Sequence, residues 1–261
     1  MFEAIHDSAR IQGRIVYAMF MREILTRYGR HNIGFLWMFV EPMTFTIGVT
    51  ALWTATKAFH GNNLPIAAFA LTGYSSVLLW RNMPARCIGA IPPNLSLMYH
   101  RNVRIIDIYL ARLLLEAMGA TMSFVVLSVV LIASGVIDPP EDLLKVVGGW
   151  LMIASFGVAL ALLLGSLSEE YELVDKLWHP AAYLIFPLSG AAFLVDALPP
   201  EAQRYVLFLP MVSGVEYVRE GYFGSRIHAH YDLSYVAVVS SVMLLFALVQ
   251  IRKLSRIVVP E

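Results

Sequence analysis

The sequence predicts an all-α integral membrane protein that forms one domain over residues 1–261. It has six expected transmembrane helices, an N-terminal amphipathic helix and a re-entrant hairpin between spans 5 and 6. Hydrophobic residues make up 58% of the chain and charged residues 15%, whereas soluble domains have about 45–50% and about 25%. Several apolar stretches reach the roughly 20 residues that a membrane-crossing helix needs. The formal net charge is zero, so the composition does not indicate nucleic-acid binding.

Six segments have the composition of transmembrane spans. We place them at about residues 34–57, 65–84, 105–137, 145–168, 177–195 and 232–251. The fifth segment is long enough to cross, but Pro180 and Pro187 interrupt it, and each proline removes a helix hydrogen bond. We therefore expect the fifth span to be broken.

The connection between the last two spans contains a second apolar stretch. Residues 205–215 (YVLFLPMVSGV) are apolar but too few to cross a membrane, which takes about 20 residues. A re-entrant hairpin with Pro210 and Gly214 at its bend would accommodate them. The alternative is a surface loop with a buried patch.

Positive charges indicate the orientation, because loops on the cytoplasmic side carry an excess of lysine and arginine. With both termini in the cytoplasm, 14 of the 19 lysines and arginines fall in inner segments. The remaining ones, Arg219 among them, fall in outer segments. We therefore expect both termini inside.

Residues 14–30 (RIVYAMFMREILTRYGR) have the pattern of an amphipathic helix. The apolar stripe comprises Tyr17, Met21, Ile24 and Tyr28, and the other side carries Arg22, Glu23, Thr26, Arg27 and Arg30. Such a helix lies along the inner membrane surface with its arginines among the lipid head groups. These arginines either only flank the first span, or they also face an anionic substrate or a cytoplasmic partner.

Glu41 lies within the first predicted span and is followed by Pro42. An unpaired charge there costs at least roughly 3 kcal/mol, so we expect it to be neutralised, paired or hydrated. It either pairs with an arginine or touches substrate, and Pro42 favours a kink that faces a polar interior. We expect no other carboxylate in the middle of a span, which argues against a proton-coupled transporter.

Two inner loops have the features of contact sites for another protein. In residues 82–112, Pro92 and Pro93 break the chain and Asn94 can cap a short amphipathic helix. We expect its exposed side chains to be Met98, Tyr99, His100 and Arg101. The second loop, residues 168–176, carries Glu169, Glu170, Glu172 and Asp175. These carboxylates indicate a basic partner, or in part a favourable interaction with the dipole of the next helix.

The sequence contains no motif for chemistry of its own. It has no GxxxxGK[ST] phosphate loop, no HExxH motif and no cysteine pair, because Cys87 is single. We therefore expect no enzymatic activity and no bound metal or cofactor, and any energy for transport must enter from a partner. His228, His230 and Asp232 could hold a metal weakly, but such residues before a span are more typical of a solvated loop.

Three stretches together resemble the permease subunits of ABC exporters for surface polysaccharides. They are REILTRYGRHNIGFLWMFVEPM (22–43), NVRIIDIYLARLLLE (102–116) and LSGAAFLVDALPPEAQRYVLFLPMVSGVEYVREGYFG (188–224). The tail EGYFGSRIHAHYD (220–232) is most similar to the KpsM-like branch, the capsular polysaccharide export permeases. One position departs from that pattern, because Leu209 stands before Pro210 where Asn is expected. We expect the turn there to be capped differently.

The resemblance implies a homodimer in a bacterial inner membrane, with both termini in the cytoplasm. Each copy would bind one cytoplasmic ABC ATPase subunit, which holds the ATP and Mg²⁺. Residues 9–31 would form the interface helix, 94–103 the coupling helix and 196–230 a periplasmic re-entrant region. The ATPase contacts would be Asn94, Leu95, Met98, Tyr99, His100, Arg101, Asn102, Glu169 and Glu170. The cargo would be a lipid-linked acidic glycan, passed to a periplasmic polysaccharide co-polymerase and an outer-membrane exporter.

The candidate substrate-binding residues are polar-tipped rings and charged groups near the inner mouth. Sugars bind aromatic faces and hydrogen-bond donors, and a sliding polymer needs many weak contacts. The candidates are Arg22, Arg27, Arg30, Trp37, Glu41, Tyr74, Trp80, Arg81, Arg86, Trp178, His179 and Tyr183. Trp37 and Trp80 could instead belong to an interfacial belt, whereas Trp178 and His179 adjoin Pro180, where a broken helix would face protein or water.

Two other function classes stay open at this point. A stand-alone channel or secondary transporter is disfavoured by the single expected carboxylate and by the absence of an internal inverted repeat. A membrane enzyme for lipid-linked sugars would need catalytic carboxylates or histidines clustered at one membrane face. Within the exporters, O-antigen, teichoic acid or a small hydrophobic compound are alternative cargoes.

Overall fold

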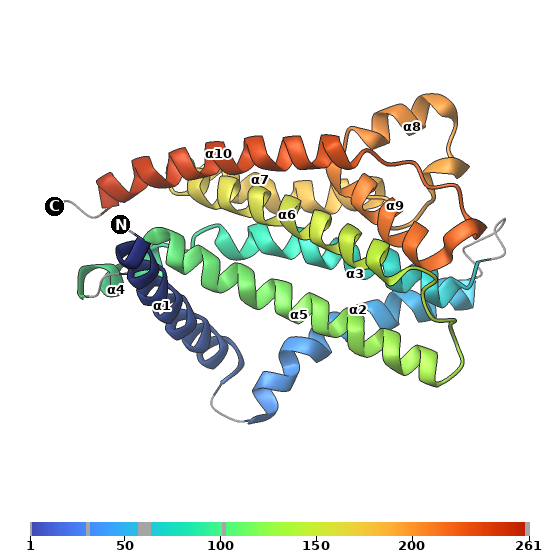
Figure 1. Ribbon diagram of the computed structural model, residues 1–261, viewed down its shortest axis with the longest axis horizontal. Coiled ribbons are helices and arrows are strands. Elements are labelled where there is room, and N and C mark those ends of the chain that lie inside the picture. The colour runs from blue at the N-terminus through green and yellow to red at the C-terminus, as the bar shows by residue number, and fades with distance from the viewer. Residues whose placement is uncertain (1, 30–31, 57–63, 101–102, 259–261) are drawn as a thin grey trace.

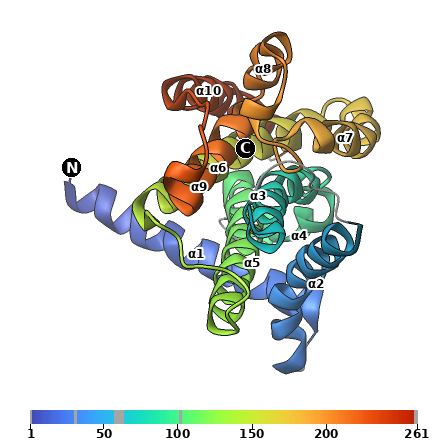
Figure 2. The ribbon, with the colours of Figure 1, turned by 90° about the vertical axis from the view of Figure 1, so that its right-hand side faces the viewer.

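The computed structural model describes residues 2–29, 32–56, 64–100 and 103–258, which Figures 1 and 2 show from two directions. In these ranges the chain forms α-helices and short 3₁₀ turns, without any strand. Both described chain ends lie at the end of the bundle that also holds α4 (Leu95–His100), as Figure 1 shows. The molecule therefore has a terminal end, which carries α4, and an opposite end.

Four helices are long and apolar enough to cross a membrane. They are α2 (Asn32–Thr56), α5 (Ile105–Ala133), α6 (Leu143–Ser168) and α10 (Leu233–Val258). These helices correspond to the first, third, fourth and sixth predicted spans. α10 continues beyond the predicted end at residue 251, because the basic residues that follow lie within the helix and do not end it.

The second predicted span forms a helix, α3 (Ile66–Cys87). This helix lies buried at the centre of the molecule and is less apolar than the four helices above. It carries Arg81 and Arg86, which lower its hydropathy. Phe69 and Trp80 on this helix are almost completely buried. Figure 2 shows α2 and α10 on opposite sides of the bundle, with α3, α5 and α6 between them.

α6 packs against α3, α9 (Pro210–Phe223) and α10 at close range. Glycines make this possible, because small residues let helix backbones approach within a membrane. Gly149 faces α9, and Gly157 and Gly165 face α3. A Cβ atom on Gly165 would lie 2.7 Å from the Cβ of Cys87. The spacing of the helices around α6 therefore depends on these glycines.

The fifth predicted span is shorter than expected. Its helix, α7 (Glu172–Ile185), continues through Pro180, so the predicted break at this residue is wrong. A proline inside a helix removes one hydrogen bond, and the remaining bonds hold α7 together. The helix ends before Pro187, which lies in a 3₁₀ turn. Its 14 residues span about 21 Å, less than the roughly 30 Å of a bilayer core.

Two helices follow at the opposite end of the bundle, α8 (Pro200–Leu207) and α9. The chain turns just before Pro210, which is the first residue of α9. The prediction that Gly214 lies at the bend is wrong, because Gly214 is inside α9 and packs against Ile153 of α6. Leu209 precedes the helix without capping it through its side chain, as its apolar chemistry leads us to expect.

α9 is anchored by a fully buried arginine. Arg219 donates hydrogen bonds of 2.6 Å to the carbonyl oxygens of Gly190, Ala191 and Phe193, and it lies 4.0 Å from Glu216. Buried charges need such partners, because an unpaired one is very costly. Arg219, which the charge count assigns to an outer segment, is thus internal and holds the segment after α7 against α9.

α1 (Phe2–Tyr28) is longer than the predicted interface helix and packs through a different face. Its buried side chains are Val16, Met19 and Ile24, whereas Tyr17 and Met21 of the predicted stripe are exposed. The helix turns its predicted charged side partly toward the protein, as described below. The side chain of Tyr28 lies outside the described residues.

We expect the substitution Gly165→Ala to destabilise the protein. The new Cβ would force α6 and α3 apart, and overpacking of this kind costs about 1–3 kcal/mol. Gly48→Ala is the matched control, since a Cβ atom on this glycine of α2 meets nothing within 4 Å. Thermal unfolding of the purified protein in detergent measures both. Equal melting temperatures for the two variants would contradict the packing role of Gly165.

Candidate functional site

A groove of about 350 Å³ lies between α1, α2, α3, α5 and α7. Its lining residues are Arg27, Met38, Glu41, Pro42, Phe45, Tyr74, Leu78, Arg81, Asn82, Ala85, Arg86, Leu115, Glu116, Gly119, Ala120 and His179. The structure thus brings together six of the predicted substrate residues: Arg27, Glu41, Tyr74, Arg81, Arg86 and His179. The groove combines charged groups with an aromatic ring, as a site for a polar polymer would.

Glu116 of α5 organises the charges in the groove. Its Oε1 accepts hydrogen bonds from Arg27 of α1 and from Nε of Arg86 of α3, the latter at 2.9 Å. Only 10% of the Glu116 side chain is exposed. One carboxylate therefore ties three helices together, and charge-assisted bonds of this kind are the stronger ones.

A second ion pair lies one helical turn away along α1 and α5. Arg112 of α5 donates from Nε to Glu23 of α1 at 3.1 Å, and from Nη1 to the backbone oxygen of Arg86 at 2.8 Å. Glu23 and Arg112 are both mostly buried. The charged side of α1 thus binds the protein through Glu23 and Arg27, so Arg27 does not lie among the lipid head groups as expected.

Glu41 is paired, as one of the two predicted alternatives requires. Its Oε2 lies 3.6 Å from Nη2 of Arg27, and 41% of its side chain is exposed. The following residue, Pro42, cannot donate to the carbonyl oxygen of Met38, since proline lacks an N–H group. This oxygen faces Gly119 of α5, where an added Cβ would lie 3.2 Å away. Proline and glycine thus allow α2 and α5 to approach at the groove.

Glu41 is not the only carboxylate within a span. Glu116 lies in the interior of α5, so the prediction of a single one is wrong, whereas Asp107 lies in the first turn of this helix. Asp107 is buried and accepts hydrogen bonds from Nε2 of Gln12 at 3.0 Å and from the backbone N of Arg104 at 2.9 Å. All three carboxylates therefore have hydrogen-bond or ion-pair partners within the protein.

Arg81 differs from the other groove arginines. Its guanidinium carbon lies 5.3 Å from the centre of the Tyr183 ring, within cation–π range. Among the residues that the structure describes, no carboxylate forms an ion pair with Arg81. Tyr74 lies nearby on α3, and its ring meets Phe186 edge to face at 5.9 Å. Arg81 is therefore a groove cation whose charge stays available.

The other predicted substrate residues lie elsewhere. Trp80 and Trp178 are buried away from the groove, and Trp80 packs against Phe156. Trp37 is exposed on α2 and does not line the groove. Arg22 donates to the side-chain oxygen of Asn94. Arg30 lies outside the described residues.

The predicted coupling segment forms a 3₁₀ turn (Pro92–Asn94) followed by α4. Asn94 is buried and donates from Nδ2 to the carbonyl oxygen of Ala90 at 2.8 Å, while its Oδ1 accepts from Arg22. This residue therefore joins the segment to α1 instead of facing outward.

The outward face of α4 is smaller than predicted. Tyr99 is 65% exposed, but Met98 is buried, so its predicted exposure is wrong. The reason is helical geometry, since the two neighbours point in different directions and Met98 points toward the core. Leu95 is partly buried. The side chain of His100, and Arg101 and Asn102, lie outside the described residues.

The acidic loop after α6 binds the protein itself. Glu169 accepts a hydrogen bond from the backbone N of Ile91 at 3.4 Å, and burial raises the pKa of its carboxyl. Glu170 accepts from Nζ of Lys253 at 2.9 Å, and this bond lowers the pKa of the Glu170 carboxyl. Glu172 pairs with Lys176 one turn on. The loop thus joins the coupling segment to the end of α10.

The polar residues before α10 have local partners. Asp232 accepts from the backbone N of Tyr235 at 2.9 Å, as a helix cap does. The ring of His230 contacts Asp196 at 3.1 Å. In the described part of the chain, no three histidine, cysteine or acidic side chains come together as metal ligands. Asp232 and His230 thus each have a partner within the chain.

Sequence reasoning missed Glu116 and Arg112 as members of the site. The charge pattern of the two helices could have indicated them. Glu23 and Arg27 are four residues apart in α1. Arg112 and Glu116 are also four residues apart in α5, with the basic residue first. Two helices with such patterns can form two ion pairs side by side, since residues four apart share a helix face. Asn82 was also missed, and nothing in its surroundings in the sequence marks it.

Comparison with known proteins gives consistent similarities over almost the whole chain. The family described as ABC-2 type transporter matches residues 14–223. The chain is 44% identical to the capsule polysaccharide export inner-membrane protein CtrC of Neisseria meningitidis serogroup B, over 98% of this chain and 96% of that protein. It is 40% identical to the capsule polysaccharide export inner-membrane protein BexB of Haemophilus influenzae, with the same coverage. It is 28% identical to the polysialic acid transport protein KpsM of Escherichia coli, over 91% of this chain and 92% of that protein.

We expect Glu116→Gln to lower the free energy of unfolding by about 2–3 kcal/mol, somewhat less than the loss of one partner from a fully buried pair. The amide leaves the charges of Arg27 and Arg86 without their shared carboxylate. Thermal unfolding in detergent measures the change. Glu172→Gln is the control, because that side chain is 91% exposed and its loss should have little effect. A Glu116 variant as stable as this control would show that the network does not hold the groove together.

Proposed function

The chain belongs to the ABC-2 type transporter family, and from this premise we propose that it is the transmembrane permease subunit of an ATP-driven exporter of capsular polysaccharide. The observation that carries the proposal is the near full-length similarity to proteins named for capsule polysaccharide export at the inner membrane. The sequence has no phosphate loop, so a separate nucleotide-binding subunit would bind ATP and Mg²⁺ and hydrolyse the ATP. This subunit would supply the path and the partner would supply the energy.

The proposed route for that energy starts at α4. Tyr99 is exposed at the terminal end and would enter the ATPase subunit. Asn94, at the start of the segment, binds Arg22 of α1. One turn further along α1, Arg27 binds Glu116 in the groove. A movement of α4 would therefore reach the groove through the Arg22–Asn94 bond, the α1 helix and the Arg27–Glu116 bond.

The proposed cargo is an acidic glycan on a lipid anchor. The relative named for polysialic acid transport acts, by its name, on an acidic polymer. In the groove, Arg27 and Arg86 are occupied by Glu116, whereas Arg81 forms no ion pair within the described chain. An acidic sugar would contact Arg81, and the neighbouring exposed ring of Tyr183 would stack on a sugar face.

The groove also supports a proposal about assembly. Glu41 and Arg86 are each 41% exposed, so the groove is open along one side. A second copy of the chain facing it would close the path. We place both termini and α4 in the cytoplasm, and α8 and α9 as a re-entrant region at the periplasmic end, with α3 and α7 completing six spans. A periplasmic co-polymerase and an outer-membrane exporter would receive the polymer.

We expect Tyr99→Ala to reduce glycan display on the cell surface several-fold without changing the amount of protein in the membrane. The substitution removes the exposed ring that would enter the ATPase subunit. Surface staining of glycan and ATP hydrolysis by the purified complex measure the effect. Tyr205→Ala is the matched control, because Tyr205 is 75% exposed at the opposite end. Normal display and ATP hydrolysis with Tyr99→Ala would refute coupling through α4.

We expect Arg81→Gln to slow glycan export about tenfold, since a hydrogen bond to a charged group contributes about 1.5 kcal/mol. Stability should change little, because Arg81 has no carboxylate partner in the described chain. Export into proteoliposomes that contain the ATPase complex measures the rate, and Arg204→Gln, an exposed arginine of α8, is the control. Export at the unaltered rate would remove Arg81 from the proposed path.

A further inference from the structure

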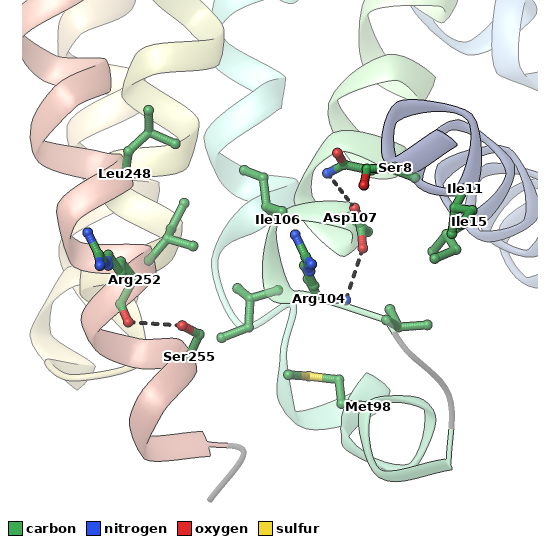
Figure 3. A pocket seen from close by; sticks show the side chains of 14 residues that line it. Ser8, Ile11, Ile15, Met98, Arg104, Ile106, Asp107, Leu248, Arg252 and Ser255 are labelled. Carbon is green, nitrogen blue, oxygen red and sulfur yellow. Dashed lines mark hydrogen bonds between the residues drawn. The ribbon is translucent and has the colours of Figure 1, made fainter. Parts of the chain in front are cut away.

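A second and larger pocket, of about 870 Å³, lies at the terminal end of the molecule. It is bounded by α1, α4, the start of α5 and the end of α10. Figure 3 shows Arg104 in the middle of the opening, with Leu248, Arg252 and Ser255 of α10 on one side and Ile11 and Ile15 of α1 on the other. The pocket shares no lining residue with the groove, so it is a separate site.

Most of the pocket lining is apolar. Ile11 and Ile15 on α1 face Leu248 on α10 across the opening, with Ile106 of α5 between them, and Ile251 of α10 also lines the pocket. α5 begins and α10 ends here, and both are long and apolar enough to cross a membrane. The pocket therefore lies where apolar spans reach the membrane surface, and Leu248 and Ile11 are respectively 43% and 51% exposed.

Two arginines border this apolar lining. Arg104 and Arg252 are exposed, and among the residues that the structure describes neither forms an ion pair. Asp107 also lines the pocket, but its oxygens accept from Gln12 and from the backbone N of Arg104, and no ion pair joins it to the guanidinium of Arg104 among the described residues. Lys253, next to Arg252, is by contrast paired with Glu170. The pocket thus combines an uncovered apolar surface with two available positive charges.

We propose that this pocket binds one anionic phospholipid of the inner leaflet. Its phosphate would lie between Arg104 and Arg252, and an acyl chain would lie along Ile11, Ile15 and Leu248. Basic pockets between transmembrane helices on the cytoplasmic side are suited to such head groups. A wholly apolar occupant would leave both charges unmatched, and a soluble anion would leave the isoleucines uncovered. The lipid would join α10 to α1 and α4, which the described chain connects only weakly.

The test compares the unaltered protein with the double variant Arg104→Gln/Arg252→Gln, both purified in a neutral detergent. Dioleoylphosphatidylglycerol or dioleoylphosphatidylcholine is titrated in, and thermal unfolding and native mass spectrometry report binding. We expect phosphatidylglycerol to raise the melting temperature and to stay bound, and phosphatidylcholine to do neither. The double variant should bind phosphatidylglycerol about 30-fold more weakly, since each arginine near an anionic lipid contributes about 1 kcal/mol.

Two controls make the result specific. Arg204→Gln removes one positive charge at the opposite end and should keep the full response to phosphatidylglycerol. The single variant Arg252→Gln, at an exposed position, serves if the double variant does not fold. Equal responses to the two lipids, or an unchanged response in the arginine variants, would overturn the proposal.

A second experiment separates a lipid from a protein occupant. Ser255→Cys places a reactive thiol at the pocket, and the native Cys87 is buried. In membranes that contain the assembled complex, we expect this thiol to react with a maleimide attached to a phospholipid head group. A disulfide between two copies, or cross-linking to an ATPase subunit in its place, would show that protein fills the pocket and would overturn the proposal.

Discussion

A carboxylate within a membrane span needs a partner of opposite charge, and Glu116 forms ion pairs with arginines from two other helices. This requirement explains the arrangement of the terminal half of the molecule. α1 is held against α5 because Arg27 reaches Glu116, and the end of α3 is held there through Arg86. The groove is consequently charged and accessible to water, because Glu116, Arg27 and Arg86 both join its helices and line it.

The opposite half of the molecule is stabilised by close helix packing and by the hydrogen bonds of one buried arginine. There, Gly149 and Gly214 let α6 and α9 approach closely, and the buried Arg219 binds three carbonyl oxygens in the segment after α7. Both solutions follow from the same restriction, because polar groups away from water must find partners within the protein. The ion pairs lie beside a groove that substrate could enter, whereas Arg219 is fully enclosed.

Hydropathy and charge predicted the broad architecture well. The apolar stretches gave helices near their predicted positions, because burial in lipid is a property of the stretch itself. The predictions that are wrong concern features that depend on tertiary contacts. No local pattern showed that Met98 would point inward, that Gly214 would lie within α9, or that Pro180 would leave α7 intact. Half of the predicted substrate residues line one groove, and Trp80 does not because it packs into the core.

The two ion pairs between α1 and α5 also fix the register of these helices. Glu23 meets Arg112 and Arg27 meets Glu116, so the numbering rises in the same direction on both helices. Sliding α1 by one turn in either direction would bring Glu23 to Glu116, or Arg27 to Arg112, and like charges repel at this spacing. α1 therefore cannot slide along α5 by one turn while both ion pairs are kept. A displacement of α1 either moves α5 together with it or breaks both ion pairs.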